Sequence, residues 1–179
     1  STGTGQFSTF LEVQNSPAEN GFNSSDNFEL DSKNSNNFNH VVSLSTLVEV
    51  DNAGTPTPGG GFYVFRLDIH EANSAPYLSL DGLQLWQSDN SNLTHNEVAT
   101  GGAIGANDTQ GSAPNFAFTG GLATKVYDLN DSDLNPLTLQ TPTSILLNSQ
   151  LTSGSGGHTD DLIVLVPTST FDANLGDNI

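Results

Sequence analysis

Three acidic side chains near the middle of the chain, Asp68, Glu71 and Asp81, have the types and spacing needed to bind a metal ion together. The first two follow the alternating segment FYVFRLDI, and the third lies in an Asp-Gly pair. Ionised carboxylates that converge in a half-buried corner repel one another unless a cation or several hydrogen-bond donors compensate them. Ca²⁺ suits such a corner because it takes many oxygen ligands, including backbone and amide carbonyls. We predict a calcium site formed by these three residues.

Two of these acids also have an interpretation without a metal. Asp68 can pair with Arg66 or cap a turn, and Asp81 can simply form an Asp-Gly bend. Zinc is a poor alternative to calcium, because the chain has no cysteine and no pair of histidines at a ligand spacing.

A second acidic segment follows a short predicted strand at residues 125–129. The spacing of Asp128, Asp131 and Asp133 resembles the early positions of a calcium-binding loop. No central glycine and no downstream glutamate complete an EF-hand. We nevertheless add Asp128 and Asp131 to the predicted calcium ligands.

Two β segments must position the first three acids. Residues 62–69 alternate as a strand does, and their odd-numbered positions form one fully apolar face that belongs in a core. Residues 77–87 form the second segment, in which the leucines change parity at Asp81 and Gly82. A β-bulge at this dipeptide would restore the facing of the side chains.

The rest of the chain has the same character, with short apolar segments between turns rich in Gly, Pro, Asn and Ser. Residues 162–167, LIVLVP, predict a strand buried on both sides, whereas the polar residues 168–179 predict no further strand. Only 34% of the residues are hydrophobic, which fits two β layers with wide polar loops. We predict one all-β domain spanning residues 1–179, a β-sandwich or jelly roll with long polar loops.

The charge and composition restrict the surroundings and partners of the chain. Three basic residues against 20 acidic ones give a net charge of −17, which excludes nucleic acid as a partner. The chain contains no apolar run long enough for membrane insertion. It also lacks methionine, even at position 1, and we interpret it as a processed, extracellular or cell-surface chain whose signal peptide is already removed.

The sequence gives little support to an enzyme. The four histidines (His40, His70, His95 and His158) are scattered, and neither a cysteine nor a Gly-x-Ser-x-Gly motif is present. A binding role has better support from Trp86, the only tryptophan, which with Gln84 and Gln87 could form a sugar-stacking platform. The alternative for this side chain is packing under the long loop that follows it.

Several segments, in order along the chain, are similar to a domain found in secreted and surface-anchored bacterial proteins. The segments of this chain are GFNSS, NNFNHVVSLSTL, FYVFRLDIHE, YLSLDGLQLWQSDNSNL, KVYDLND, SGSGGHTDD and LIVLVPTSTF. The corresponding elements of the family include GFNTD, LDINE, LSLDEIQIWQSD, VYDLD, SGSGSGDM and VYIP. The resemblance covers residues 21–171, and the paired LDINE and LSLDE elements are its most specific part. It implies an extracellular, all-β protein and names no reaction.

The chain departs from this pattern in ways that affect the predicted function. His70 stands in place of the asparagine of LDINE, and Gly82 in place of the acid of LSLDE, so a cation site common to the family would have fewer oxygen ligands here. The family continues into a further strand, and this sequence stops at Ile179 without it, so either the sequence is incomplete or the sandwich lacks a strand. We expect a sheet edge left open, and we expect the N-terminal segment 1–13 of a neighbouring copy, through a strand at residues 6–13, to fill it.

These observations together predict a secreted, calcium-stabilised structural protein. It would be the subunit of an extracellular matrix, surface layer or filament, assembled as a homopolymer by strand donation between copies. The alternative is a calcium-containing carbohydrate-binding or adhesion module with a glycan partner.

Overall fold

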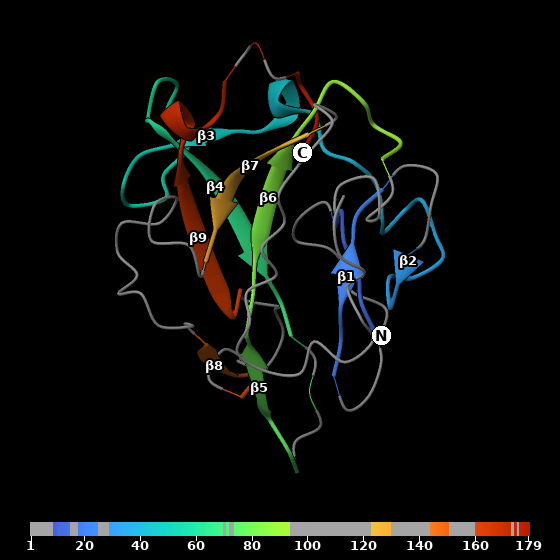
Figure 1. Cartoon of the computed structure of the whole chain (residues 1–179). Helices are drawn as coiled ribbons and strands as arrows, with labels where there is room; N and C mark the ends of the chain where they lie inside the picture. The colour runs from blue at the N-terminus through green and yellow to red at the C-terminus, as the bar shows by residue number, and fades with distance from the viewer. Residues whose placement is uncertain are drawn as a thin grey trace. The chain divides into compact units, whose positions relative to one another are not determined.

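The computed structural model describes residues 9–14, 18–24, 29–69, 71, 74–93, 123–129, 144–150, 160–172, 174 and 176–179. Its secondary structure consists of short β-strands and two single-turn 3₁₀ helices, η1 (Leu44–Thr46) and η2 (Thr168–Thr170), with no α-helix in these ranges (Figure 1). The predicted all-β class is therefore confirmed for this part of the chain. None of its helices has the length and apolar character needed to span a membrane.

The described residues form two compact units. One comprises those of Leu47–Gln84 and Tyr127–Phe171, and the other those of Phe7–Thr46, Leu85–Val126 and Asp172–Ile179.

The first unit contains an antiparallel three-stranded sheet in the order β3 (Glu49–Val50), β4 (Phe62–Leu67), β9 (Leu162–Pro167). The predicted apolar face of residues 62–69 is confirmed, because Phe65 and Ile69 are buried on it. Val166 of β9 lies opposite Tyr63 and is fully buried. The Tyr63 ring also meets the Phe171 ring edge to face, with 5.4 Å between centroids. This face is the core side of the sheet.

Residues 51–61 connect β3 to β4, and the turn at the start of this loop is held by its own polar groups. The carboxylate of Asp51 accepts hydrogen bonds of 2.9 Å from the backbone N–H groups of Ala53 and Thr55. Gly54 has a φ of +78°, which glycine adopts without strain. Gly60 lies so close to β3 that a Cβ atom would be 2.3 Å from the carbonyl oxygen of Val50. Glycine is therefore required at this second position by space.

β9 differs from the prediction of a strand buried on both sides. Ile163 is 50% exposed and Pro167 is also exposed, while Val166 on the opposite face is buried. Among the described strands, β9 pairs only with β4. The prediction was wrong because an apolar run is also compatible with an edge strand that has only one packed face.

The second predicted segment, residues 77–87, is two strands rather than one strand with a bulge. β5 (Tyr77–Leu80) pairs with β8 (Ile145–Asn148), whereas β6 (Gln84–Gln87) pairs with β7 (Thr124–Asp128). The chain is not in a strand at residues 81–83, where the bulge was expected. The change of leucine parity therefore marks a change of partner strand. In the described sheets, β4 is not a neighbour of either strand.

The second unit contains the pair β1 (Gly21–Phe22) and β2 (Glu29–Leu30), and Val13 bridges to Ser32 beside it. Lys33 N–H donates to the carbonyl of Glu12 at 2.8 Å, so the described end of the predicted donor strand is paired within its own chain. Residues 6–8 lie outside the described ranges, and exchange of this strand between copies stays a prediction.

Candidate functional site

The three acids of the predicted calcium site lie around the ends of β4 and β5. Asp68 and Asp81 are exposed and Glu71 is half-buried. The hydroxyl of Ser79 donates a 2.6 Å hydrogen bond to Asp81, as expected for a local bend. Within the described ranges, no group of three or more His, Asp or Glu side chains is arranged to hold a metal ion. The calcium site stays a prediction.

Two acids that were not among the predicted ligands contact the C-terminal half of β4 and the residues after it. Asp160 accepts a 2.5 Å hydrogen bond from the guanidinium of Arg66. Asp161 accepts one of 2.8 Å from the backbone N–H of Ile69. Both acids precede β9, and the antiparallel register brings the start of β9 to the end of β4. The SGSGGHTDD segment showed these acids in the sequence, but only the register shows what they contact.

Asp128, another predicted calcium ligand, is a buried carboxylate at the end of β7. It is 2% exposed and accepts a 2.9 Å hydrogen bond from the side-chain amide of Gln84 in β6. Burial, together with the charge of Asp128, raises the pKa of the neighbouring Tyr127 phenol. Asp131, the partner predicted for Asp128, lies outside the described ranges. Of the two predicted ligands Asp128 and Asp131, the structure therefore describes only Asp128, whose carboxylate accepts a hydrogen bond from the Gln84 amide.

Trp86, the predicted sugar platform, is half-buried in the second unit. It packs against the buried side chains of Leu93 and Ala123, together with Phe22. The ammonium of Lys125 lies 5.9 Å from the centre of its ring. These contacts favour the alternative in which Trp86 is a packing residue.

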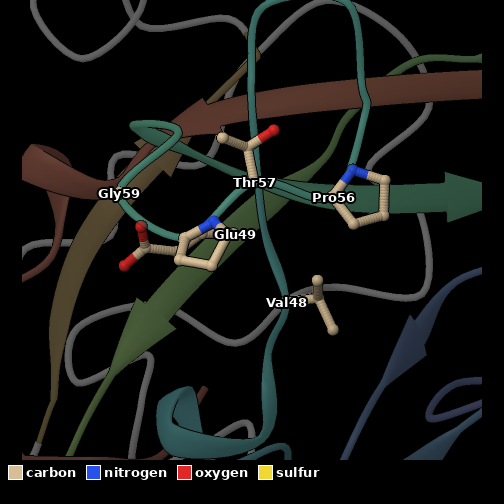
Figure 2. Close-up of a pocket in the computed structure, with 6 residues that line it drawn as sticks. Val48, Glu49, Pro56, Thr57 and Gly59 are labelled. Atoms are coloured by element: carbon tan, nitrogen blue, oxygen red, sulfur yellow. The ribbon is translucent and has the colours of Figure 1, made fainter.

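An open hollow of about 410 Å³ lies beside β3 in the first unit. Figure 2 shows that it is formed by the segment that contains Val48 and by the turn after β3. Its lining residues are Val48, Glu49, Pro56, Thr57, Pro58 and Gly59. None of the predicted site residues lines it. With one carboxylate and two prolines, it lacks a set of side chains that could carry out a reaction.

The last residues of the chain form a hydrogen-bonded site that the sequence did not predict. Asn178 makes antiparallel bridges with Ser43 on one side and with Ser88 on the other. On the first side, Val42 and Ile179 exchange two backbone hydrogen bonds of 2.8 Å, and Leu44 N–H donates to Asp177 at 2.7 Å. On the other side, Ser88 and Asn178 exchange two of 2.9 Å. Figure 1 shows the C-terminus near the end of β6.

Polar side chains complete this site. The amide of Gln87, which is fully buried, donates to the carbonyls of Asp172 and Gly176 at 2.7 and 2.6 Å. The carboxylate of Asp177 accepts hydrogen bonds from the hydroxyl of Ser43 and from both the hydroxyl and the backbone N–H of Ser45. The Ser43 hydroxyl is the main cause of the lowered pKa of Asp177; desolvation opposes it, and the backbone N–H and hydroxyl of Ser45 lower the pKa further.

One described histidine, His40, has a buried Nδ1 atom without a hydrogen-bond partner. His70, His95 and His158 lie outside the described ranges. The prediction that the chain is not an enzyme stays a prediction.

Comparison with known proteins gives no relative: no protein family matches the chain, and neither does any curated protein or any solved structure.

Proposed function

We propose that the protein is a secreted, non-enzymatic structural subunit that assembles with its own copies into an extracellular matrix, surface layer or filament. The observation that carries this proposal is the outer edge of β9. No other strand in the described ranges pairs with that edge. An unpaired strand edge presents backbone donors and acceptors to any strand that approaches, which is why soluble monomers usually protect it.

The sequence of β9 offers little of that protection. Its six residues, LIVLVP, carry no charge, and the proline stands only at the last position. Ile163 projects a half-exposed apolar side chain beside the edge. We propose that this edge pairs with a strand of a second copy. The partner strand that we propose is β9 of that copy, because its outer edge is also open in the described residues.

A β-sandwich or jelly roll is the architecture that we propose for the assembled subunit. The β3–β4–β9 sheet buries one face, with Phe65, Ile69 and Val166 on it. A sheet with one apolar face is stable only when a second layer covers that face. This requirement supports a two-layer arrangement.

Calcium is the second part of the proposal. Two of the three basic residues are already paired with single acids, Lys33 with Glu12 at 2.8 Å and Arg66 with Asp160 at 2.5 Å. Three basic residues cannot balance 20 acidic ones, and the resulting net charge of −17 favours the binding of cations. Extracellular Ca²⁺ sites commonly bind with millimolar affinity. We propose Asp68, Glu71 and Asp81 as one group of ligands and Asp128 with Asp131 as another.

The test is electron microscopy of three purified proteins, with and without Ca²⁺. They are the native chain, the Ile163→Glu variant and the Ile163→Thr variant. Glutamate at position 163, opposite Arg66, places a charge on the open edge strand. Threonine keeps the high β propensity of the position and adds no charge. We expect ordered assemblies for the native chain and Ile163→Thr, and few or none for Ile163→Glu. Because Ile163 is half exposed, either change should lower the stability of the monomer by about 1 kcal/mol or less.

Native protein that stays monomeric under all conditions would refute the structural role. Assemblies that persist unchanged in Ile163→Glu would refute the role of the β9 edge.

A further inference from the structure

The C-terminal segment, residues 176–179, is extended along two neighbouring segments, and Asn178 forms an isolated β-bridge with each of them. Five backbone hydrogen bonds connect residues 177–179 to Val42, Leu44 and Ser88. The side chain of Asp177 is exposed, and those of Asn178 and Ile179 are only half-buried. Backbone hydrogen bonds of this kind form with any extended peptide, and the flanking side chains decide which peptide fits best. The receiving segments therefore form a peptide slot, here filled by the chain's own end.

The side chains around the slot select for this particular sequence. Ser43 and Ser45 direct donors at the carboxylate of Asp177, so the slot favours an acidic residue at that position. The preceding residue must be glycine, because Gly176 has a φ of +101° and a Cβ atom there would lie 2.2 Å from the backbone nitrogen of Asp89. An Asp preceded by Gly is the feature that the slot recognises.

We propose that this slot, formed by residues 42–45 and Ser88, accepts the extended segment 176–179 of a second copy when the protein assembles. The same segment from another copy would make every hydrogen bond that the internal strand makes, so exchange loses no contact within the slot. This inference rests on the proposed assembly and identifies one of its contacts.

The two proposed contacts differ in geometry and would make different contributions to an assembly. Pairing of two β9 edges uses the same surface on each copy, so it is self-complementary and stops at a dimer. A strand of one copy in the slot of another uses two different surfaces, and such a contact can continue from copy to copy. Strand exchange would therefore extend the dimers into a filament or layer.

The absence of cysteine from the chain allows a direct test. Ser43 and Asn178 face each other as a non-hydrogen-bonded antiparallel pair, because the bonds run through the residues on either side of them. Such a pair has a spacing suited to a disulfide. The test mixes a Ser43→Cys chain with an Asn178→Cys chain under assembly conditions, oxidises them mildly, and identifies cross-linked dimers by intact mass. The mixed dimer forms only when the strand of one copy occupies the slot of the other.

The matched control replaces Ser43→Cys with Asn34→Cys, an exposed position of the same unit outside the slot. We expect at least a tenfold excess of the mixed dimer over this control. If Ser43→Cys does not fold, Ser88→Cys replaces it, because Ser88 also pairs with Asn178. Assemblies with no excess of mixed dimer would overturn strand exchange and leave the structural role standing. Absence of any assembly would overturn both.

Discussion

The side-chain amide of Gln84 donates a 2.9 Å hydrogen bond to the carboxylate of Asp128, which is almost completely buried at the end of β7. A buried carboxylate is stable only when hydrogen bonds or a cation compensate its charge. The pair therefore links the packing of the first unit to the predicted binding of calcium.

Substitution of Asp128 tests that link. We expect Asp128→Ala to lower the free energy of unfolding by about 1–3 kcal/mol, because the Gln84 amide loses its acceptor. Denaturant unfolding measures the change, with Asp89→Ala at an exposed position as the control. If Asp128 also binds Ca²⁺, Asp128→Asn will reduce the stabilisation by added Ca²⁺ without a comparable loss in its absence. Equal stability of Asp128→Ala and the control would show that the buried pair contributes nothing.

Removal of calcium should lower the melting temperature of the native chain. A ligand that binds only the folded state stabilises it by about 2.7 kcal/mol at a free concentration 100 times its Kd. Thermal melts in EDTA and in a series of Ca²⁺ concentrations measure this effect. The variant that combines Asp68→Asn, Glu71→Gln and Asp81→Asn is expected to lose most of it. A native melt that does not move between EDTA and millimolar Ca²⁺ would exclude the calcium site.

The attachment of the C-terminal segment, residues 176–179, should weaken in acid. The hydroxyl of Ser43 and the two donors of Ser45 lower the pKa of Asp177 in the folded state. A lowered folded pKa contributes stability that is present above the unfolded value, near 3.8, and is lost as the pH falls through the folded value. Hydrogen exchange at Val42 and Leu44 between pH 5 and pH 2.5 measures the loosening.

Asp177→Asn is the matched variant for this experiment. It keeps the shape of the side chain and removes the titrating group, so we expect a smaller dependence of exchange on pH than in the native chain. The same acid-induced increase in both proteins would mean that other carboxylates control the release of the strand.

Substitution of Trp86 tests whether this side chain is a packing residue or a sugar-binding platform. Because its ring packs against Leu93 and Ala123, we expect Trp86→Ala to lower the free energy of unfolding by about 2–4 kcal/mol. Tyr77→Ala, at a side chain that is 61% exposed, should change it little. Glycan microarrays provide the second measurement. Glycan binding by the native chain that disappears in Trp86→Phe, at unchanged stability, would instead support the carbohydrate-binding module.

The sequence predicted those features that depend on local periodicity. Alternation along residues 62–69 identifies the buried face of β4, because side chains of a strand point to opposite sides in turn. Local periodicity does not show which other strand a given strand pairs with. The pattern around Asp81 and Gly82 therefore suggested one kinked strand, although the two halves pair with β8 and β7.

The hydrogen bonds of the C-terminal segment had no signal in the sequence for a related reason, although the described residues of 168–179 contain no further strand, as predicted. Residues 176–179 are held by backbone groups and by the polar side chains of Ser43, Ser45 and Gln87, none of which produces a hydrophobic pattern. For the predicted calcium ligands, the sequence gives the acidic residue types but not their positions in space. Which of them meet depends on the packing of distant segments, as the pairing of Arg66 with Asp160 illustrates.

The β4–β9 pairing also determines when the first unit can fold during synthesis. Arg66 and Asp160, which are joined at one end of this ladder, are 94 residues apart in the chain. At a synthesis rate of roughly 5–20 residues per second, β4 waits for several seconds before its partner leaves the ribosome. Contacts between such distant residues also make folding slow. Until β9 has been synthesised, the β4–β9 ladder of the first unit cannot form, and the apolar face of β4 lacks this partner.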